Sequence, residues 1–292
     1  MTAPQRRYFS LMSIKMARQQ TEGQISIFDV ELPPPPRVSP AHVPDDEYAL
    51  TNFPQGIPTV NEILKLLEKG LYKVNAHEFL SDVFECSAIA ISNKFDMQHA
   101  DEREKRYLQI IKKYTPDMQN LLAEVFAKIF VLLSQQVNPA VGFADYLGEL
   151  YMRSETSNSK AGQFFTPYCV SKMCAECSID PHRVEQAIEN DEVLTFSEPA
   201  CGSGGMIIAA ADTLYYKYHF NYSRNMLVEC SDIDSRCCHM CYLQLSLAGI
   251  PAIIFRRNTL TMETWDRWET PAYIMQWTRF KDFLRGTGND WR

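Results

Sequence analysis

One stretch in the second half of the chain joins an acidic side chain to a sharp glycine turn. Residues 198–205 read Glu-Pro-Ala-Cys-Gly-Ser-Gly-Gly, after an apolar run at 193–196 and before a helix-forming run at 206–211. Glycines permit a tight turn and let a ligand approach the backbone, and a helix N-terminus presents unpaired N–H groups. A strand, a glycine turn and a helix in this order open a nucleotide-binding α/β unit, although a purely structural turn has the same pattern. The acid before the glycines favours a ligand with hydroxyl groups or positive charge over a pyrophosphate.

A second motif lies upstream, where residues 162–167 read Gly-Gln-Phe-Phe-Thr-Pro. The two motifs together are far more specific than either alone. With them, residues 143–260 resemble the N-6 adenine-specific DNA methyltransferases, of the modification-subunit type found in type I restriction-modification systems. In that family the GQFFTP segment lies across the methionine end of S-adenosyl-L-methionine, and a (D/S)PACGSGG loop wraps the same cofactor. The resemblance implies this cofactor and methyl transfer to adenine in DNA. Glu198 replaces the usual first residue of the loop; it keeps a carboxylate but lengthens the side chain.

An acid also follows the second expected strand, at 226–230. Such folds bind ribose hydroxyls at this position, which favours Asp232, whereas Asp234 is expected to cap the next helix. Related enzymes place an Asp or Asn near the adenine ring of the cofactor where Asn258 stands here. The cofactor-binding candidates are therefore Gln163, Phe164, Phe165, Thr166, Glu198, Ala200, Gly202, Gly204, Asp232 and Asn258.

An α/β fold must position these residues. Runs at 193–196, 226–230 and 252–255 predict three parallel strands ordered 3-2-1, joined by right-handed crossovers through helices. This is a partial Rossmann-like class I S-adenosylmethionine-dependent methyltransferase domain. We expect a flexible Pro-rich tail at 1–45, a helical N-terminal domain at 46–150 and a short cofactor-binding α/β domain at 151–292. The helical domain supports the cofactor loop or, in a less favoured interpretation, reads bases directly. Helices are expected at 76–91, 103–114, 118–134, 143–151, 168–177 and 235–248, with Thr166 and Pro167 capping the one at 168–177.

The second signature of the adenine methyltransferases, (D/N/S)-P-P-(Y/F/W), is missing from the sequence. In the family its polar side chain accepts hydrogen bonds from the target amino group, and its aromatic ring stacks on the flipped base. The nearest approach is Thr-Pro-Ala-Tyr at 270–273, which leaves Tyr273 as a catalytic candidate. The polar residues before it, 265–269, predict no strand, and too few residues follow Phe255 for the remaining strands of a complete methyltransferase sheet.

Two hypotheses follow from these departures. In the first, the protein is a working adenine methyltransferase, and Tyr273 together with a partner chain or a homodimer replaces the missing half. In the second, it is a catalytically inactive accessory protein that binds the cofactor or associates with DNA, for example to protect the DNA of a mobile element.

Composition sets further limits. Hydrophobic residues at 46% are ample for a core, but a net charge of −7 is unusual for a stand-alone DNA binder. A local basic patch or another subunit, such as a specificity or restriction subunit, must then supply DNA contacts. No apolar run suits a membrane span or a signal peptide, and nine cysteines without framework spacing fit a reducing cytoplasm.

The cysteines do not form a recognisable metal motif. Cys174 and Cys177, and the group at 237–241, lie within expected helices, where the spacing does not make a zinc knuckle. Buried, reduced cysteines on helix faces are the favoured interpretation, and Cys201 is expected to pack beside the cofactor loop rather than to act as a nucleophile.

The tail contains an apolar segment, Gln-Ile-Ser-Ile-Phe at 24–28, followed by four prolines at 33–36. It resembles the peptide by which bacterial DNA-acting proteins dock onto the replicative sliding clamp, with Gln24, Ile27 and Phe28 as the docking residues. The alternative is a short segment that packs on the body of the protein.

Overall fold

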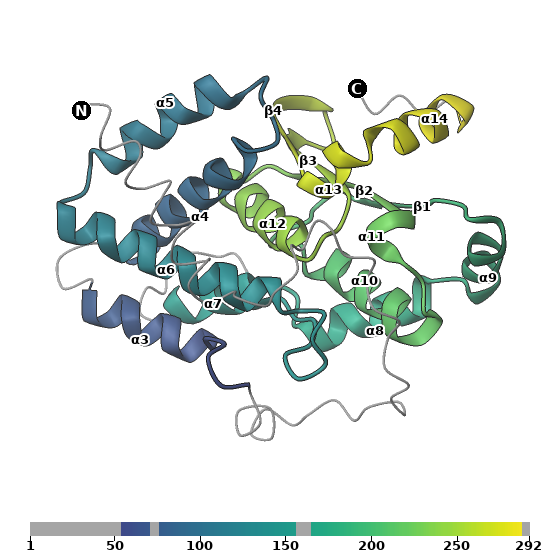
Figure 1. The fold of residues 1–292 in the computed structure, drawn as a ribbon, viewed down its shortest axis with the longest axis horizontal. Coiled ribbons are helices and arrows are strands. Elements are labelled where there is room, and N and C mark those ends of the chain that lie inside the picture. The colour runs from purple at the N-terminus through teal and green to yellow at the C-terminus, as the bar shows by residue number, and fades with distance from the viewer. Residues whose placement is uncertain (1–53, 71–75, 156–164, 288–292) are drawn as a thin grey trace.

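The computed structural model describes residues 54–70, 76–155 and 165–287. Figure 1 shows a group of helices beside a four-stranded sheet, which carries further helices on its faces. The helices before the sheet are α3 (Val60–Gly70), α4 (Ala76–Ser92), α5 (Ala100–Ile111), α6 (Pro116–Ser134), α7 (Tyr146–Glu155), α8 (Tyr168–Ser178) and α9 (Pro181–Asn190). The remaining elements are β1 (Leu194–Glu198), α10 (Gly205–Tyr218), α11 (Tyr222–Asn225), β2 (Met226–Asp232), α12 (Ser235–Leu247), β3 (Ala252–Asn258), β4 (Glu263–Glu269), α13 (Pro271–Met275) and α14 (Trp277–Thr287).

The three expected strands form as predicted. Strand β1 pairs with β2 in parallel, and β2 pairs with β3 in parallel, in the order β1-β2-β3. Because α10 and α12 are the crossovers between parallel neighbours, the carboxyl ends of β1 and β2 meet at one edge of the sheet.

The expectation that residues 265–269 form no strand is wrong. Strand β4 pairs with β3 in antiparallel orientation. Apart from Trp265, its outward residues are polar, so its sequence lacks the apolar pattern of a strand, but Trp268 is buried. Arg103 of α5 holds β4 from outside, since its guanidinium donates to the Arg267 carbonyl at 2.7 Å and lies 4.0 Å from the Trp268 ring centroid. Pairing with β3 and the contacts of Arg103 therefore stabilise β4, although its sequence lacks the apolar alternation of a typical strand.

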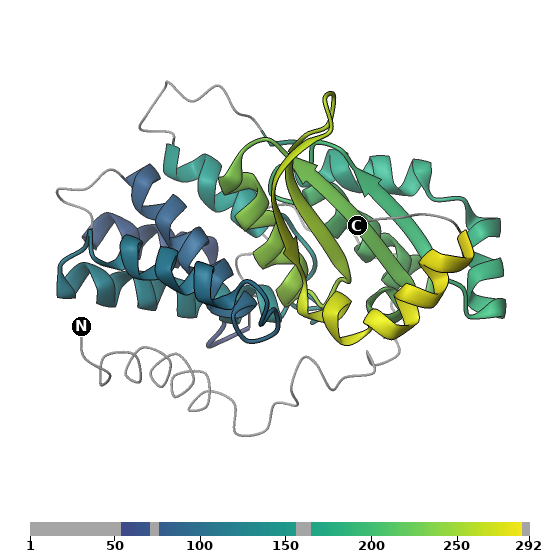
Figure 2. The ribbon, with the colours of Figure 1, turned by 90° about the horizontal axis from the view of Figure 1, so that it is seen from above.

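Two apolar clusters lie on the two faces of the sheet. The larger one joins α3–α7 to α10 and α12, and α12 is buried on nearly every side because it lies between the sheet and helices α4, α6 and α7. The smaller one lies under α13 and α14, which Figure 2 shows along one side of the sheet. Its buried members are Val193, Leu227, Ile253, Phe255, Tyr273, Phe280 and Leu284.

Most helix predictions hold within a few residues, and their caps explain the boundaries. Thr115 caps α6 with Pro116 in the first turn, and Asp234 caps α12 by accepting from the Arg236 N–H at 2.8 Å. The expected cap of α8 is wrong, because Pro167 is the N-cap residue and no side chain caps this helix. Helix α9 was not expected at all, although Asp180 and Pro181 begin it with an ordinary cap and N1 proline.

Three predicted features lie wholly or partly outside the described residues. They are the clamp-docking residues Gln24, Ile27 and Phe28, the first part of the GQFFTP motif including Gln163 and Phe164, and the tail at 1–45. These stay predictions. Among the described helices, none is long and apolar enough to cross a membrane.

Candidate functional site

The glycine loop joins the end of β1 to the start of α10. The loop needs left-handed backbone at Gly202 (φ 52°) and Gly204 (φ 97°), which glycine adopts without steric cost. Its start is fixed by two hydrogen bonds: the Ala200 N–H donates to the Glu198 carboxylate at 3.1 Å, and the Cys201 N–H donates to the Ser231 carbonyl at 2.8 Å. The loop is therefore tied to the carboxyl end of β2.

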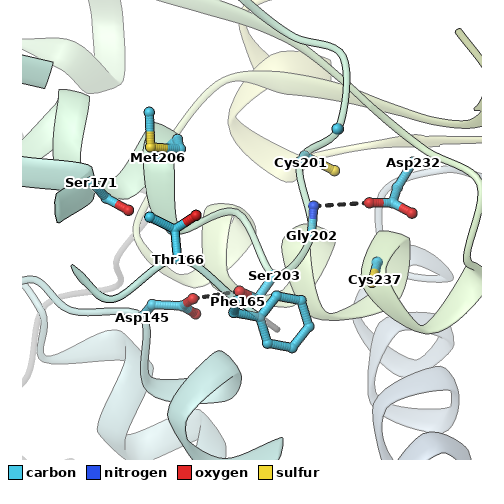
Figure 3. Close-up of a pocket in the computed structure, with 12 residues that line it drawn as sticks. Asp145, Phe165, Thr166, Ser171, Cys201, Gly202, Ser203, Met206, Asp232 and Cys237 are labelled. Atoms are coloured by element: carbon cyan, nitrogen blue, oxygen red, sulfur yellow. Dashed lines mark hydrogen bonds between the residues drawn. The ribbon is translucent and has the colours of Figure 1, made fainter. Parts of the chain in front are cut away.

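A cavity of about 240 Å³ opens beside this loop. Figure 3 shows its wall, which comes from the glycine loop, the end of β2, the start of α12 and the segment before α8. The lining residues are Asp145, Phe165, Thr166, Ser171, Ala200, Cys201, Gly202, Ser203, Gly205, Met206, Asp232 and Cys237. Two of them are acidic, and no Lys, Arg or His is among them.

Asp232 lies where β2 ends, with its carboxylate held by backbone donors. The Gly202 N–H donates to Oδ2 at 2.9 Å, and the Asp234 N–H donates to Oδ1 at 2.9 Å. These bonds orient the carboxylate beside the glycine loop and leave further acceptor capacity for a ligand hydroxyl.

The GQFFTP motif and the glycine loop meet through Phe165. A Cβ at Gly202 would lie 3.0 Å from the Phe165 ring, so the absence of a side chain there makes room for the aromatic ring. Tyr151 of α7 packs edge-on against Phe165, with ring centroids 5.8 Å apart. The structure thus brings together two motifs that are more than thirty residues apart in the sequence.

A polar cluster behind Tyr151 fixes this ring in turn. The Tyr151 hydroxyl and the Arg236 guanidinium lie 2.5 Å and 2.6 Å from His77 Nε2. Arg236 also forms an ion pair with Asp234, the cap of α12. Helices α4, α7 and α12 therefore position Phe165 together, which is a supporting role for part of the helical region.

Asp145, immediately before α7, is the second acid of the cavity. It is 8% exposed. Its carboxylate accepts hydrogen bonds from the Ser203 hydroxyl (2.5 Å), the Gln244 side-chain amide (2.8 Å) and the Gly148 N–H (2.9 Å). Burial raises the pKa of the Asp145 carboxyl, while these three hydrogen bonds oppose the shift.

The predicted site residues divide into three groups. Phe165, Thr166, Ala200, Gly202 and Asp232 line the cavity. Glu198, Gly204 and Asn258 do not line it: Glu198 bonds back to its own loop, Gly204 sets the turn, and Asn258 accepts from the backbone of Leu260 in the β3–β4 hairpin. Gln163 and Phe164 lie outside the described residues.

Sequence reasoning missed several cavity residues. Ser203, Gly205 and Met206 continue the glycine motif and were available from it. Asp145 gave a weaker signal, because the expected helix at 143–151 placed it inside the helix, whereas α7 begins only at Tyr146 and leaves Asp145 at the capping position. Cys237 was singled out only as a packing residue.

Tyr273 lies far from this cavity. It is in α13, beside the amino end of β3, stacked on Phe280 and 2% exposed. Thr270 caps α13 and bonds to the backbone around the start of β3, accepting from Ala252 N–H and donating to the Ile250 carbonyl, both at 2.9 Å. The cavity is at the carboxyl ends of the strands, so the Thr-Pro-Ala-Tyr segment is at the opposite edge of the sheet.

The cysteines differ in environment more than expected. Cys201, Cys230 and Cys241 are buried, with sulfur atoms within 4.8 Å of one another beneath the glycine loop. Hydrogen bonds with its two neighbours and burial raise the pKa of Cys201, which keeps its thiol protonated. The expectation that Cys174 and Cys177 are buried is wrong, because Cys174 is half-buried and Cys177 is exposed on α8.

Three parallel strands, a glycine turn after the first and an acid after the second define an α/β methyltransferase fold. Residues 144–283 match the model of the family described as N-6 DNA Methylase. The matched segment starts just before Asp145 and includes the whole described wall of the cavity.

Other comparisons add little. The crystal structure of a type I restriction-modification system methyltransferase subunit from Streptococcus thermophilus is similar at 12% identity, with a TM-score of 0.30. The match covers 66% of this chain and 55% of that subunit, so this chain spans about half the length of the protein it matches. No significant match was found among curated proteins.

Proposed function

We propose that the chain binds S-adenosyl-L-methionine and takes part in methylation of adenine N6 in DNA. The observation that carries this proposal is the charge of the cavity: among the residues that the structure describes, two carboxylates line it and no Lys, Arg or His does. Phosphate-binding loops offer backbone N–H groups at a helix N-terminus, usually with a Lys or Arg. Here the Asp145 carboxylate lies against that helix start, because a Cβ at Gly205 would be 2.9 Å from its Oδ2. The negative charge beside this glycine turn therefore disfavours a pyrophosphate and suits a ligand with hydroxyl groups and positive charge.

The residues of the cavity fit the proposed cofactor. Asp232, Gly202, Phe165 and Thr166 all line the cavity. In this proposal Asp232 would accept from ribose hydroxyls, Gly202 would let the ligand approach the loop backbone, and Phe165 and Thr166 would cover the methionine end. Glu198 and Asn258 do not line the cavity, so their proposed contacts with the ligand have no support from its lining. The bound cofactor would supply an electrophilic methyl group, and the work of these side chains is to bind and orient it.

The base-binding side is a separate matter. The Thr-Pro-Ala-Tyr segment caps a helix at the amino ends of the strands, opposite the cavity. This position favours a second candidate function, in which the chain binds the cofactor but does not by itself transfer the methyl group. In the first candidate, a partner chain, such as a specificity or restriction subunit or a second copy, supplies the groups that hold the flipped adenine. The net charge of −7 supports a DNA contact that is shared with another subunit.

Two assays separate these candidates. Calorimetry with S-adenosyl-L-methionine tests cofactor binding by the purified chain. Transfer of tritiated methyl groups to unmethylated DNA, with the chain alone and with candidate partner subunits, tests the reaction. Binding with transfer only in the presence of a partner supports the shared-site account; binding without transfer under every condition supports the accessory role; absence of binding contradicts both.

A further inference from the structure

A buried acid without a cation is the unusual feature of the cavity. Asp145 is 8% exposed, and its hydrogen-bond partners Ser203, Gln244 and Gly148 are all neutral. Within the part of the chain that the structure describes, no Lys, Arg or His forms an ion pair with it. Removing a carboxylate from water is costly unless a positive charge compensates, so this site invites a cationic ligand group.

A structural role alone does not require the charge. Asp145 accepts from the Gly148 N–H in the first turn of α7, as an N-cap residue does, and it ties α7 to the glycine loop through Ser203. Asn caps helices about as well as Asp and offers the same oxygen without a buried charge. The cap therefore explains a polar side chain at this position but not an ionisable one.

The Asp145 carboxylate keeps free acceptor capacity on one of its two oxygens. Oδ1 accepts two hydrogen bonds, from Gly148 and Gln244, whereas Oδ2 accepts one, from Ser203. The residue lines the cavity itself. A carboxylate oxygen accepts two hydrogen bonds with ease, which leaves Oδ2 able to accept from an ammonium group of a ligand.

The two acids lie at opposite sides of the cavity. Figure 3 shows Asp145 beside Ser203 and Thr166, and Asp232 beyond Gly202 near Cys237. A ligand that reaches both must offer hydrogen-bond donors at both of its ends. S-adenosyl-L-methionine has this shape, with ribose hydroxyls in one part and an α-ammonium group at the methionine end.

We propose that Asp145 is the counter-ion for the α-ammonium group of the ligand, and that it selects ligands with an amino-acid end. This inference rests on the proposed function for the identity of the ligand. Ser203 and Gln244 then act as positioning residues, because they orient the carboxylate through their own hydrogen bonds. The site recognises a primary ammonium group attached to a thioether or sulfonium nucleoside, and it discriminates against nucleosides without that end.

Calorimetry with three ligands tests the assignment: S-adenosyl-L-methionine, S-adenosylhomocysteine, and 5′-methylthioadenosine, which lacks the amino-acid end. For Asp145→Asn we expect affinity for the first two to fall about 10- to 100-fold, since one charge-assisted hydrogen bond is lost. Affinity for 5′-methylthioadenosine should change less than about twofold, because that ligand does not reach Asp145.

Asp212→Asn is the matched control. Asp212 is a buried acid of α10 that pairs with Lys172 and accepts from the Tyr168 hydroxyl, and it does not line the cavity. Its replacement should leave the ratio of affinities for S-adenosylhomocysteine and 5′-methylthioadenosine unchanged. Thermal melting of both variants checks the fold.

The outcomes separate this inference from the proposed function. If the parent protein binds none of the three ligands, both ideas fail. If the parent binds S-adenosyl-L-methionine but Asp145→Asn binds all three ligands unchanged, or loses all three equally, only the role of Asp145 fails. If the variant does not fold, the parent protein is titrated with S-adenosylhomocysteine and with the analogue of this ligand that lacks the α-amino group. We expect S-adenosylhomocysteine to bind at least about tenfold more tightly than this analogue. Equal affinities would overturn the assignment.

Discussion

The acidic side chains at the two ends of the parallel strands, called here the amino edge and the carboxyl edge of the sheet, have opposite environments. At the amino ends of the strands, exposed Asp191 accepts from Asn225 at 2.8 Å and pairs with Arg224 and Arg279. Hydrogen bonds from Asn225 and Arg279 lower the pKa of Asp191 to about 2. At the carboxyl ends, buried Asp145 has only neutral partners, and its pKa is raised. The charge of Asp191 is thus compensated within the protein, whereas Asp145 has no cationic partner among the described residues and keeps acceptor capacity for a ligand.

Changes at the two ends of the strands should therefore have different consequences. Replacements at the amino edge should lower stability and leave ligand binding intact, and replacements at the carboxyl edge should mainly lower binding. The glycine loop is the exception, because its backbone geometry serves both.

The largest effect is expected for Gly204→Val. The position has φ 97°, and a Cβ there would lie 3.1 Å from the Cys241 sulfur, so both the backbone and the contact oppose a branched side chain. Chemical denaturation should show a loss of about 3 kcal/mol, with loss of ligand binding. The control Gly249→Ala has φ 71° but nothing within 4 Å, so it should lose only about 1 kcal/mol. Equal losses in the two variants would argue against a tightly packed loop.

At the amino edge, Thr270→Val removes the cap of α13 and the bonds to Ala252 and Ile250 while keeping the shape of the side chain. Leaving these buried backbone groups without partners should lower the free energy of unfolding by about 1–3 kcal/mol. Affinity for S-adenosyl-L-methionine, measured by calorimetry below the melting range, should stay within about twofold of the parent value. A large loss of affinity would mean that the two edges are coupled and that the comparison is wrong.

At the carboxyl edge, Asp232→Ala should have the converse effect. It removes acceptors for the Gly202 and Asp234 N–H groups and for the ligand hydroxyls. We expect binding of S-adenosyl-L-methionine to weaken by about 1.5–3 kcal/mol if the lost hydrogen bonds are charge-assisted. Glu263→Ala, an exposed acid of β4 outside the cavity, is the control. Unchanged affinity in Asp232→Ala would remove this residue from the site.

How much of this arrangement the sequence predicts depends on the kind of signal. The glycine turn and the acid after β2 were predictable, because backbone geometry and strand ends impose residue types at fixed positions. The partnership of Phe165 with Gly202 and the place of Asp145 were not, since both depend on tertiary packing between α7, α10 and the segment before α8. Strand β4 could not be predicted, because pairing with β3 and the Arg103–Trp268 contact stabilise it, and its own sequence shows no alternation of apolar and polar residues.

The smallest expected effect compares the titrations of the two acids. The folded pKa of Asp191 is lowered, so its contribution to stability is present above pH 4 and is lost as pH falls toward 2. The folded pKa of Asp145 is raised, so its ionised form opposes folding, and stability relative to Asp145→Asn should increase as pH falls below that pKa. Melting temperatures of the parent, Asp191→Asn and Asp145→Asn between pH 3 and pH 8, a range chosen to span the ordinary carboxyl pKa, should therefore diverge in opposite directions. The same sign for both differences would contradict the contrast.

The most direct test of the account is calorimetric titration of the intact chain with S-adenosyl-L-methionine, beside ATP as a phosphate-bearing nucleoside of similar size. The acid-lined cavity predicts saturable one-to-one binding of S-adenosyl-L-methionine and no measurable binding of ATP, because none of the described residues that line the cavity is basic and able to neutralise phosphate. Binding of ATP with equal or higher affinity, or no heat with S-adenosyl-L-methionine, would contradict the assignment of this cavity.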